Sequence, residues 1–463
     1  MKSFRTLLVV SLFAGLLFAP VASARQSQSP APDYHSLGRA FVMNLANRQF
    51  DKAAAAFNSQ VTAALPPDKL GQIWDQLLAQ EGAFLQISSA SVAEQGAYHV
   101  VAVTCIFARG VLNTVVAFDS DGKIAGLHFV PAGNSGAVSE SASSSWTPPA
   151  YADQSKLHEE AFPVADGQWQ LPGTLTLPNG KGPIPAVVLV PGSGPEDQDE
   201  TIGPNKPFKD LAWGLASRGI AVLRYDKRTK IYGAKSSADP ATFTVKDEYI
   251  DDARAAVALL AAHSEIDPKR IFLAGHSEGG YVAPRIASGD SQIAGIAILE
   301  GNTRQMEKLV LDQLHYEAGL GGANVAQIEK MIPDAEKAAA QMESPELKPG
   351  MTVSIIGASL PASYILDLRG YDPAAVAASM KIPILVIQGS RDYQVTTTDY
   401  AGWQKALAGH ANATLKLFPD INHLMIAGSG ASSPEEYMRP GQHVAAEVVN
   451  AIASWANSFS SKP

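Results

Sequence analysis

A serine surrounded by small residues is the strongest candidate for chemistry in this sequence. The stretch Ala274–Gly280 reads AGHSEGG, with Ser277 at its centre. The apolar run RIFLAGHS predicts a strand up to the serine, and EGGYVAPRIAS predicts a helix after it. Such an abrupt turn needs small neighbours, which Gly275, Gly279 and Gly280 supply. The turn lifts the hydroxyl above the sheet edge, beside the free N–H groups of a helix N-terminus. Ser277 is therefore the predicted nucleophile.

A serine hydroxyl needs a base to take its proton, and histidine is the usual one. On a strand–turn–helix site the chain order is serine, acid, histidine. His423, in LKLFPDINHLM, lies on the loop after the last predicted strand and is the favoured base. His443 is the alternative, although GQHVAAEVVNAIASWANSF makes it part of the closing helix. His276 adjoins the serine and is expected to point elsewhere.

The acid of such a triad is expected after the strand that precedes the histidine loop. The run PILVIQGSRDYQV carries Asp392 at the carboxyl end of that strand. A carboxylate there can hold the imidazole in one tautomer and stabilise the imidazolium as it forms. Asp420 is an alternative close to His423, but it is expected to shape the turn. Asp367 and Asp372 are alternatives from a predicted cap.

An oxyanion on the attacked carbon needs two N–H donors. One is expected from the backbone of Glu278, directly after the serine. The other is expected from the loop VVLVPGSGPEDQDE, where the Ser193 N–H is favoured and Gly194 comes next. Four acidic residues of that loop could bind calcium, but a solvated loop is favoured because no glycine-spaced ligand pattern accompanies them. They are Glu196, Asp197, Asp199 and Glu200. This chemistry requires neither a metal nor an organic cofactor.

Composition limits the classes of protein to which the chain can belong. Its 463 residues are too many for one typical core, and 46% hydrophobic with 17% charged residues fits a globular protein. A formal net charge of −9 argues against nucleic acid or an anionic membrane as the main partner, because both attract a basic surface. The oligomeric state cannot be deduced from these figures.

The first 24 residues have the features of an export signal. Lys2 and Arg5 precede a mostly apolar run, Leu7–Ala19, and Ala22-Ser23-Ala24 offers small residues for cleavage. The run is shorter than the roughly 20 residues that cross a bilayer. We therefore expect removal of residues 1–24, an exported (periplasmic or secreted) protein, and no membrane span in the mature chain.

Helical patterns followed by strand patterns predict a small α+β domain over residues 34–131. YHVVAVTCIFARG, LNTVVAFDSDG and KIAGLHFVPA are the predicted strands, with Asp121-Gly122 as a hairpin signal. The order loosely resembles the cone-like fold of nuclear-transport-factor-like domains, and an accessory role is favoured. Cys105 is expected to be a buried, inert residue. The Ser/Gly/Ala/Pro-rich segment 132–150 predicts a linker.

From residue 151 onward, short continuous apolar runs predict strands that are covered on both faces. They are AVVLVPG, GIAVLRYD, RIFLAGHS, IAGIAILEG, PILVIQGS and ATLKLFP. Between the second and third, Tyr249, Ala253, Val257 and Leu260 recur at helical spacing. Strands alternating with helices indicate a mostly parallel sheet, which binds ligands beyond the carboxyl ends of its strands. The region of about 302–380 is expected to form a helical cap.

Taken together, residues 151–463 resemble the α/β-hydrolase superfamily. The long stretch PGSGPEDQDETIGPNKPFKDLAWGLASRGIAVLRYDKR, with GHSEGG, QGSRDYQV and INH, is similar to exported bacterial serine carboxylesterases of the EstD type. The resemblance extends more weakly over residues 34–131. It implies an α/β-hydrolase fold after a small accessory domain, Ser277, Asp392 and His423 as the triad, and hydrolysis of short acyl esters.

The sequence leaves a second and a third hypothesis besides the esterase. A serine peptidase or an acyl thioesterase would use the same triad, although residues 34–131 are too few for the β-propeller of oligopeptidases with this fold. A binding protein with an inactive hydrolase domain is the third hypothesis. It is disfavoured because no triad residue or elbow glycine is missing. The natural ester cannot be deduced from these motifs.

Overall fold

The computed structural model describes residues 33–82, 84–95, 98–107, 110–131, 146–237, 239–321, 325–356 and 358–459. The predicted signal segment 1–24 lies outside these ranges, as do residues 132–145 of the predicted linker. None of the helices within the described ranges combines the length and the apolar character needed to cross a membrane. The chain divides into two compact units, with the boundary between Ser145 and Trp146.

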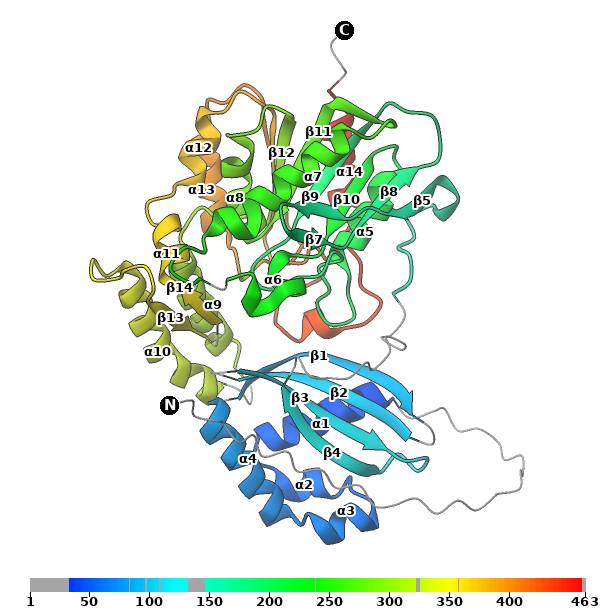
Figure 1. Cartoon of the computed structure of the whole chain (residues 1–463), viewed down its shortest axis with the longest axis vertical. Coiled ribbons are helices and arrows are strands. Elements are labelled where there is room, and N and C mark those ends of the chain that lie inside the picture. Colours follow the sequence, from blue (N-terminus) through cyan, green and yellow to red (C-terminus); the bar gives the residue numbers. More distant parts are fainter. Residues whose placement is uncertain are drawn as a thin grey trace. The chain divides into compact units, whose positions relative to one another are not determined.

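The N-terminal unit combines four helices with one antiparallel sheet, as expected for α+β (Figure 1). The helices are α1 (Tyr34–Ala46), α2 (Phe50–Ala54), α3 (Ser59–Ala64) and α4 (Pro67–Glu81). The strands pair in chain order and are β1 (Phe84–Gln95), β2 (Tyr98–Phe107), β3 (Gly110–Phe118) and β4 (Ile124–Pro131). Asp121 and Gly122 lie in the β3–β4 turn, where Gly122 has φ 70°, so the hairpin prediction is confirmed.

Strand β1 was not among the strands expected from the sequence. Its residues FLQISSASVAEQ lack a continuous apolar run, and the strand is defined by its pairing with β2. Pairing of this kind depends on the partner strand, which local patterns do not reveal. Helix α1 contacts the sheet closely at Gly38, where a Cβ atom would lie 2.6 Å from a methyl carbon of Val101.

Cys105 is fully buried in the core of this unit, as expected. Burial raises the pKa of its thiol to about 11, so the reactive thiolate is scarce at neutral pH. A role for Cys105 as a nucleophile is therefore disfavoured on physical grounds.

The second unit is built on one eight-stranded sheet in the order β16-β15-β12-β11-β9-β10-β8-β5. Six neighbouring strands are parallel, while β8 and β5 add antiparallel pairs at one side. Their bounds are β5 (Leu157–Ala161), β8 (Gly173–Pro178), β9 (Ile184–Val190), β10 (Ala221–Tyr225), β11 (Ile266–His276), β12 (Ile293–Leu299), β15 (Ile384–Gly389) and β16 (Ala413–Phe418). All six predicted strands are present, and β5 and β8 are additional. A separate hairpin pairs β6 (Val164–Asp166) with β7 (Trp169–Leu171).

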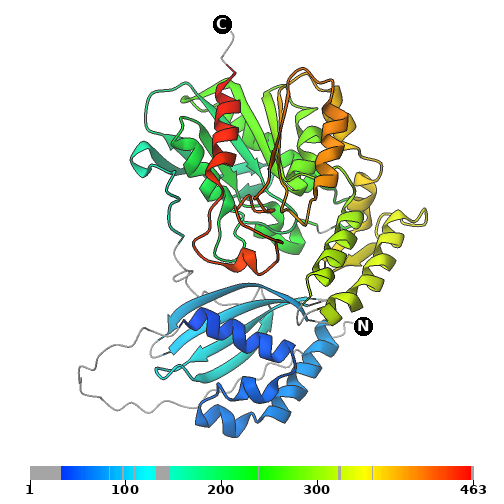
Figure 2. The same ribbon diagram turned by 180° about the vertical axis from the view of Figure 1, so that it is seen from behind.

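Helices cover both faces of this sheet. Figure 1 shows α7 and α8 over one face, and Figure 2 shows α14 over the other. The helices flanking the sheet are α5 (Pro207–Ala216), α7 (Asp251–Ala261), α8 (Glu278–Ala287), α12 (Pro373–Ser379), α13 (Thr397–Leu407) and α14 (Ala446–Asn457). Shorter helical segments are η1 (Gln154–Lys156), α6 (Arg228–Tyr232), η2 (Gly233–Lys235), the π-helical turn η3 (Lys246–Ile250) and η4 (Glu436–Met438). The expected doubly covered α/β architecture is confirmed.

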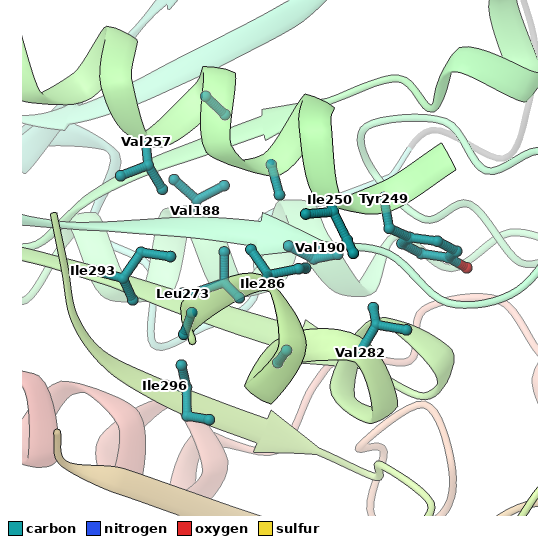
Figure 3. Close-up of a cluster of buried hydrophobic side chains, with 14 of the residues drawn as sticks. Val188, Val190, Tyr249, Ile250, Val257, Leu273, Val282, Ile286, Ile293 and Ile296 are labelled. Carbon is teal, nitrogen blue, oxygen red and sulfur yellow. The ribbon is translucent and has the colours of Figure 1, made fainter. Parts of the chain in front are cut away.

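Hydrophobic cores lie on both faces of the eight-stranded sheet. The larger one lies between the sheet and α7, α8, α12 and α13. Figure 3 shows Val188 and Leu273 of the central strands among Val257 and Ile286 from the covering helices. The predicted helical stripe from Tyr249 to Leu260 is buried in this core, as expected. Because the central strands are buried on both faces, they stay rigid and hold the loops at their carboxyl ends in place.

The cap contains its own small core and a hairpin that the sequence did not predict. It comprises α9 (Met306–Gly319), α10 (Val325–Glu343), β13 (Thr352–Ile355), β14 (Ala358–Pro361) and α11 (Ala362–Leu368). The expected range of about 302–380 also includes α12, whose Ala374 and Ala377 belong to the core of the sheet. The cap therefore ends near α11 rather than at residue 380.

Candidate active site

Ser277 occupies a sharp turn between β11 and α8, as the sequence predicts. Its backbone has φ 52° and ψ −119°, a left-handed conformation that is unfavourable for a residue with a side chain. Helix α8 begins at the next residue, so the Glu278 N–H is among those that have no acceptor within the helix. The Ser277 N–H is bonded to the carbonyl of Leu299 at 2.9 Å, which ties the turn to the neighbouring strand.

The glycines around the serine are required by the close approach of backbone segments. A Cβ atom at Gly275 would lie 2.2 Å from the carbonyl oxygen of Gly279. One at Gly279 would lie 2.3 Å from the carbonyl oxygen of Val190, in β9. Backbone atoms cannot move aside as flexible side chains can, so larger residues would push the helix away from the strands. The prediction that the turn at Ser277 needs small neighbours is therefore confirmed.

His423 and Asp392 lie together at the carboxyl ends of neighbouring strands. Asp392 follows β15, His423 follows β16, and both side chains are buried. The His423 Nδ1 atom lies 2.7 Å from Asp392 Oδ2. The other oxygen of Asp392 accepts the N–H groups of Gln394 at 2.8 Å and Val395 at 3.0 Å. With Nδ1–H donating to the carboxylate, Nε2 keeps the lone pair that a general base needs.

The structure engages the rival histidine and the rival acids elsewhere. His443 precedes α14 instead of belonging to it, which corrects the sequence-based assignment to the helix, and its Nδ1 lies 3.1 Å from Asp210 of α5. Asp420 is exposed on the turn before the histidine loop. Asp367 pairs with Arg285 at 2.7 Å, and Asp372 caps the N-terminus of α12.

Gly192, on the loop after β9, forms hydrogen bonds through both its N–H and its carbonyl group. Its N–H donates to Glu200 Oε1 at 2.7 Å, so it cannot serve an oxyanion. Its carbonyl accepts Lys227 Nζ at 3.0 Å and the Tyr249 hydroxyl at 2.8 Å. In a trans peptide the C=O and the following N–H point in opposite directions. The buried Lys227 and Tyr249 therefore direct the Ser193 N–H away from themselves, toward the outer side of the loop.

The loop also lies directly against the nucleophile. A Cβ atom at Gly192 would lie 3.2 Å from the Cβ of Ser277. Ser193, the next residue, is exposed, and within the described ranges its N–H has no hydrogen-bond partner. This geometry leaves the Ser193 N–H free to serve as the second oxyanion donor, whereas the Gly192 N–H is occupied. The choice of Ser193 before Gly194 stays a prediction.

A buried ion pair that the sequence did not reveal connects three parts of the site. His276 Nδ1 lies 2.9 Å from Glu200 Oε1, and His276 Nε2 lies 2.8 Å from the carbonyl oxygen of His423. Both ring nitrogens face acceptors, which suits a doubly protonated imidazolium. Burial alone would lower the pKa of His276, but the Glu200 carboxylate outweighs it and the pKa is raised. The pair therefore joins the Gly192 loop, the elbow and the histidine loop.

The sequence left the acidic loop after β9 as either a calcium site or a set of solvated side chains. In the structure, carboxylates of this loop contact other groups of the protein. Asp199 pairs with Arg224 at 2.8 Å and with Lys206 at 2.9 Å. Asp197 accepts two backbone N–H groups of the same loop. Among the described residues no cluster of three or more potential ligands is arranged to hold a metal ion. The favoured interpretation of a solvated loop was therefore wrong for these acids and for Glu200, because Asp199 and Glu200 pair with basic side chains and Asp197 accepts backbone N–H groups.

Lys227 and a further buried residue, Glu300, follow buried strands and could have been suspected for that reason. Lys227 lies two residues after β10, and Glu300 comes directly after β12. Carboxyl ends of parallel strands meet at one edge of the sheet, where functional groups gather. Glu200 belongs to the acidic loop, but its partner His276 lies 76 residues further along the chain.

Parts of this chain are similar to two family models and to several solved structures. Residues 205–428 match the family model described as "Serine aminopeptidase, S33", and residues 39–127 match the one described as "Protein of unknown function (DUF3887)". A solved Pyrococcus furiosus esterase is 17% identical and covers 68% of this chain and 95% of its own, with a TM-score of 0.42. The esterase domain of a Rhodothermus marinus protein is 15% identical over 65% of this chain and 98% of its own, with a TM-score of 0.40.

A curated relative is much closer in sequence. Esterase EstD of Thermotoga maritima is 40% identical over 415 residues, which cover 90% of this chain and 93% of the relative. The match therefore includes both the small N-terminal unit and the α/β unit with its cap. This chain belongs to the EstD esterase family, which places it among the carboxylic ester hydrolases with an α/β-hydrolase fold.

Proposed function

We propose that this hydrolase cleaves small carboxylic esters through a Ser277–His423–Asp392 triad and a covalent acyl-enzyme. The observation that carries the proposal is the buried 2.7 Å contact between His423 Nδ1 and Asp392, beside the strained turn that holds Ser277. The three residues follow β16, β15 and β11, whose carboxyl ends share one sheet edge. Residues so arranged match the roles of nucleophile, base and orienting acid.

The proposed reaction proceeds in two halves. The Ser277 hydroxyl oxygen attacks the acyl carbon while His423 Nε2 takes its proton, and the Ser193 and Glu278 N–H groups hold the oxyanion. His423 then gives the proton to the departing alcohol oxygen as the ester bond breaks. In the second half a water molecule loses a proton to His423 and attacks the acyl-enzyme. The acid leaves, and its departure returns the proton to Ser277.

A cavity lies in the region of the cap, beyond the helix that carries the nucleophile. It has a volume of about 230 Å³ and lies between the cap and α8. Tyr281, one helical turn beyond Ser277, forms part of its wall together with Tyr364 and Ile365 of α11. Pockets for drug-sized ligands typically measure about 300–1,000 Å³. The cavity is smaller than such pockets, but neither Ser277 nor His423 lines it, so the proposal does not rest on it. We propose short acyl esters as the preferred substrates because the chain resembles EstD-type carboxylesterases.

A substrate panel tests the class of bond and the chain length together. If short acyl esters are preferred, p-nitrophenyl acetate and butyrate should give the highest kcat/KM, with values falling by at least about tenfold for the decanoate. An alanyl anilide and an acetyl thioester serve as comparisons, since the matched family model is described as a serine aminopeptidase. Faster turnover of the anilide or the thioester than of every ester would contradict the proposal.

We also propose that the chain is exported and that residues 1–24 are removed. The support is the basic start, the apolar run and the small residues before Arg25. Expressed in a bacterial host, the parental chain should be recovered from the periplasm or medium with Arg25 as its first residue. The Leu16→Arg variant, which interrupts the apolar run, should stay in the cytoplasm with its N-terminus uncleaved. N-terminal sequencing of both proteins decides, and recovery of the parental chain with residues 1–24 attached would refute the proposal.

A further inference from the structure

A second carboxyl group is buried directly beside the triad aspartate. Glu300 follows β12, and its side chain is completely buried. Its Oε2 atom accepts the Gly389 N–H at 2.9 Å and the Gln388 Nε2 group at 2.6 Å. The same Gln388 nitrogen lies 3.3 Å from Asp392 Oδ2, the oxygen that contacts His423. Glu300 therefore belongs to the same buried polar cluster as the triad.

The remaining oxygen of Glu300 has no donor. Oε1 is buried and unpartnered in the described structure, which is costly for a carboxylate oxygen. Asp392, which shares the Gln388 contact, is the neighbouring charge that acts on Glu300, and neither a lysine nor an arginine is among the described groups that act on it. Two adjacent buried carboxyl groups cannot both keep a negative charge. One of them must carry a proton, which then lies between the two groups.

The hydrogen bonds identify which group holds that proton. Asp392 accepts His423 Nδ1 and two backbone N–H groups, all of which favour its charged form. Glu300 accepts only one backbone N–H and one neutral amide. Burial, followed by the charge of Asp392, raises the pKa of Glu300 well above its usual value. The proton therefore resides on Glu300.

The backbone at Glu300 gives independent support. Its φ of 48° lies in the left-handed region, which is uncommon for a residue with a long side chain. Such conformations persist where the surrounding structure imposes them, and they gather at functional sites. Here the Glu300 N–H is bonded to Ile387 of β15 at 3.0 Å, so the strained residue is anchored to the strand that leads to Asp392.

We propose that Glu300 is a neutral carboxylic acid that donates its proton to the Asp392 carboxylate and so holds that carboxylate toward His423. Glu300 is then a positioning residue, because it acts on the reaction through Asp392 and touches no reacting atom. The inference rests on the proposed triad and adds a fourth group to it. In the transition state, Asp392 must face a newly formed imidazolium, and a fixed carboxylate meets that charge without reorganisation.

Two substitutions at residue 300 separate the effect of donating a hydrogen bond to Asp392 from the effect of filling the same space. In Glu300→Gln, the amide oxygen can accept from Gly389 while the amide N–H₂ donates to Asp392, so kcat should stay within about threefold of the parental value. Glu300→Leu fills the space but donates nothing, so kcat should fall by about ten- to a hundredfold with KM changed less than about twofold. Equal losses of kcat in both variants would overturn the proposal.

Two measurements detect the proton on Glu300 independently of catalysis. Infrared spectra at pH 7 should show the carbonyl stretch of a protonated carboxyl group in the parental protein and not in Glu300→Gln. The difference between the two spectra is needed, because other buried acids such as Glu278 also have a raised pKa. A difference spectrum without this band would overturn the proposal, even if the leucine variant failed to fold.

Thermal stability supplies the second readout. An unfolded chain ionises Glu300 above pH about 4.3, whereas the folded protein keeps it neutral to a higher pH. Parental stability therefore falls relative to Glu300→Gln as pH rises from 5 to 8, because unfolding releases a proton over this range. The Tm difference, Gln variant minus parent, should increase steadily with pH, and a constant difference would contradict a neutral Glu300. Loss of the proposed triad would appear as activity that survives Ser277→Ala, so the two failures can be told apart.

Discussion

Replacing Ser277 by alanine lowers kcat for p-nitrophenyl acetate by about a millionfold, the loss expected when the nucleophile of a triad is removed. The hydroxyl oxygen supplies the bond to the acyl carbon, and no other side chain at the turn can take its place. Helix α8 and its close contacts depend on the neighbouring glycines, so the alanine variant should fold. Steady-state kinetics measure the loss of kcat, and circular dichroism shows whether the variant is folded.

Covalent labelling provides the positive control for that result. A fluorophosphonate probe should modify the parental protein at the peptide that contains Ser277, and peptide mapping should find the alanine variant unlabelled. Gly275 and Gly279 are left unchanged in both proteins, so the turn itself is the same. Ester turnover by a folded Ser277→Ala protein within about tenfold of the parental rate would refute the proposed mechanism.

Replacing His423 by alanine produces a loss of similar size, about a millionfold in kcat, because the serine loses its base. The substitution also removes the partner of Asp392 and leaves a buried carboxylate without its Nδ1–H donor. Stability is therefore expected to fall as well, by about 1–3 kcal/mol. Chemical denaturation and ester kinetics on the same preparation separate the two effects.

His443→Ala is the matched control for the histidine assignment. Its ring contacts Asp210 of α5 and packs edge-on to Trp146, and neither residue belongs to the proposed site. Loss of this half-buried hydrogen bond should cost about 1 kcal/mol of stability and leave kcat within about twofold. If His443→Ala abolished turnover while His423→Ala did not, the assignment of the base would be wrong.

The elements that the sequence predicted well are those determined by neighbours in the chain. Continuous apolar runs such as AVVLVPG and PILVIQGS form strands because a strand buried on both faces needs apolar residues at every position. The turn at Ser277 was recognised because glycines are needed within a few residues of it. In contrast, β1 and the cap hairpin have weak local patterns, and pairing with another strand defines them.

The candidate site was predictable as a set of residue types at strand ends. Asp392 and His423 were chosen from their positions after two consecutive strands, and the structure brings them to 2.7 Å. The same reasoning left Asp420 and His443 as alternatives, since chain order alone does not give side-chain direction. The packing of the histidine loop and of α5 decided between them.

Local patterns in the chain were sufficient to predict the mostly parallel sheet covered on both faces, the sharp turn at Ser277 and the short list of groups able to form a triad. The contacts of Glu200, His276 and Glu300 became known only from the folded chain, because their partners come from distant parts of the sequence. His276, for instance, contacts the carbonyl of a residue 147 positions away. The physical reason is that apolar patterns act locally, whereas the protonation and orientation of a buried polar group depend on every segment packed around it.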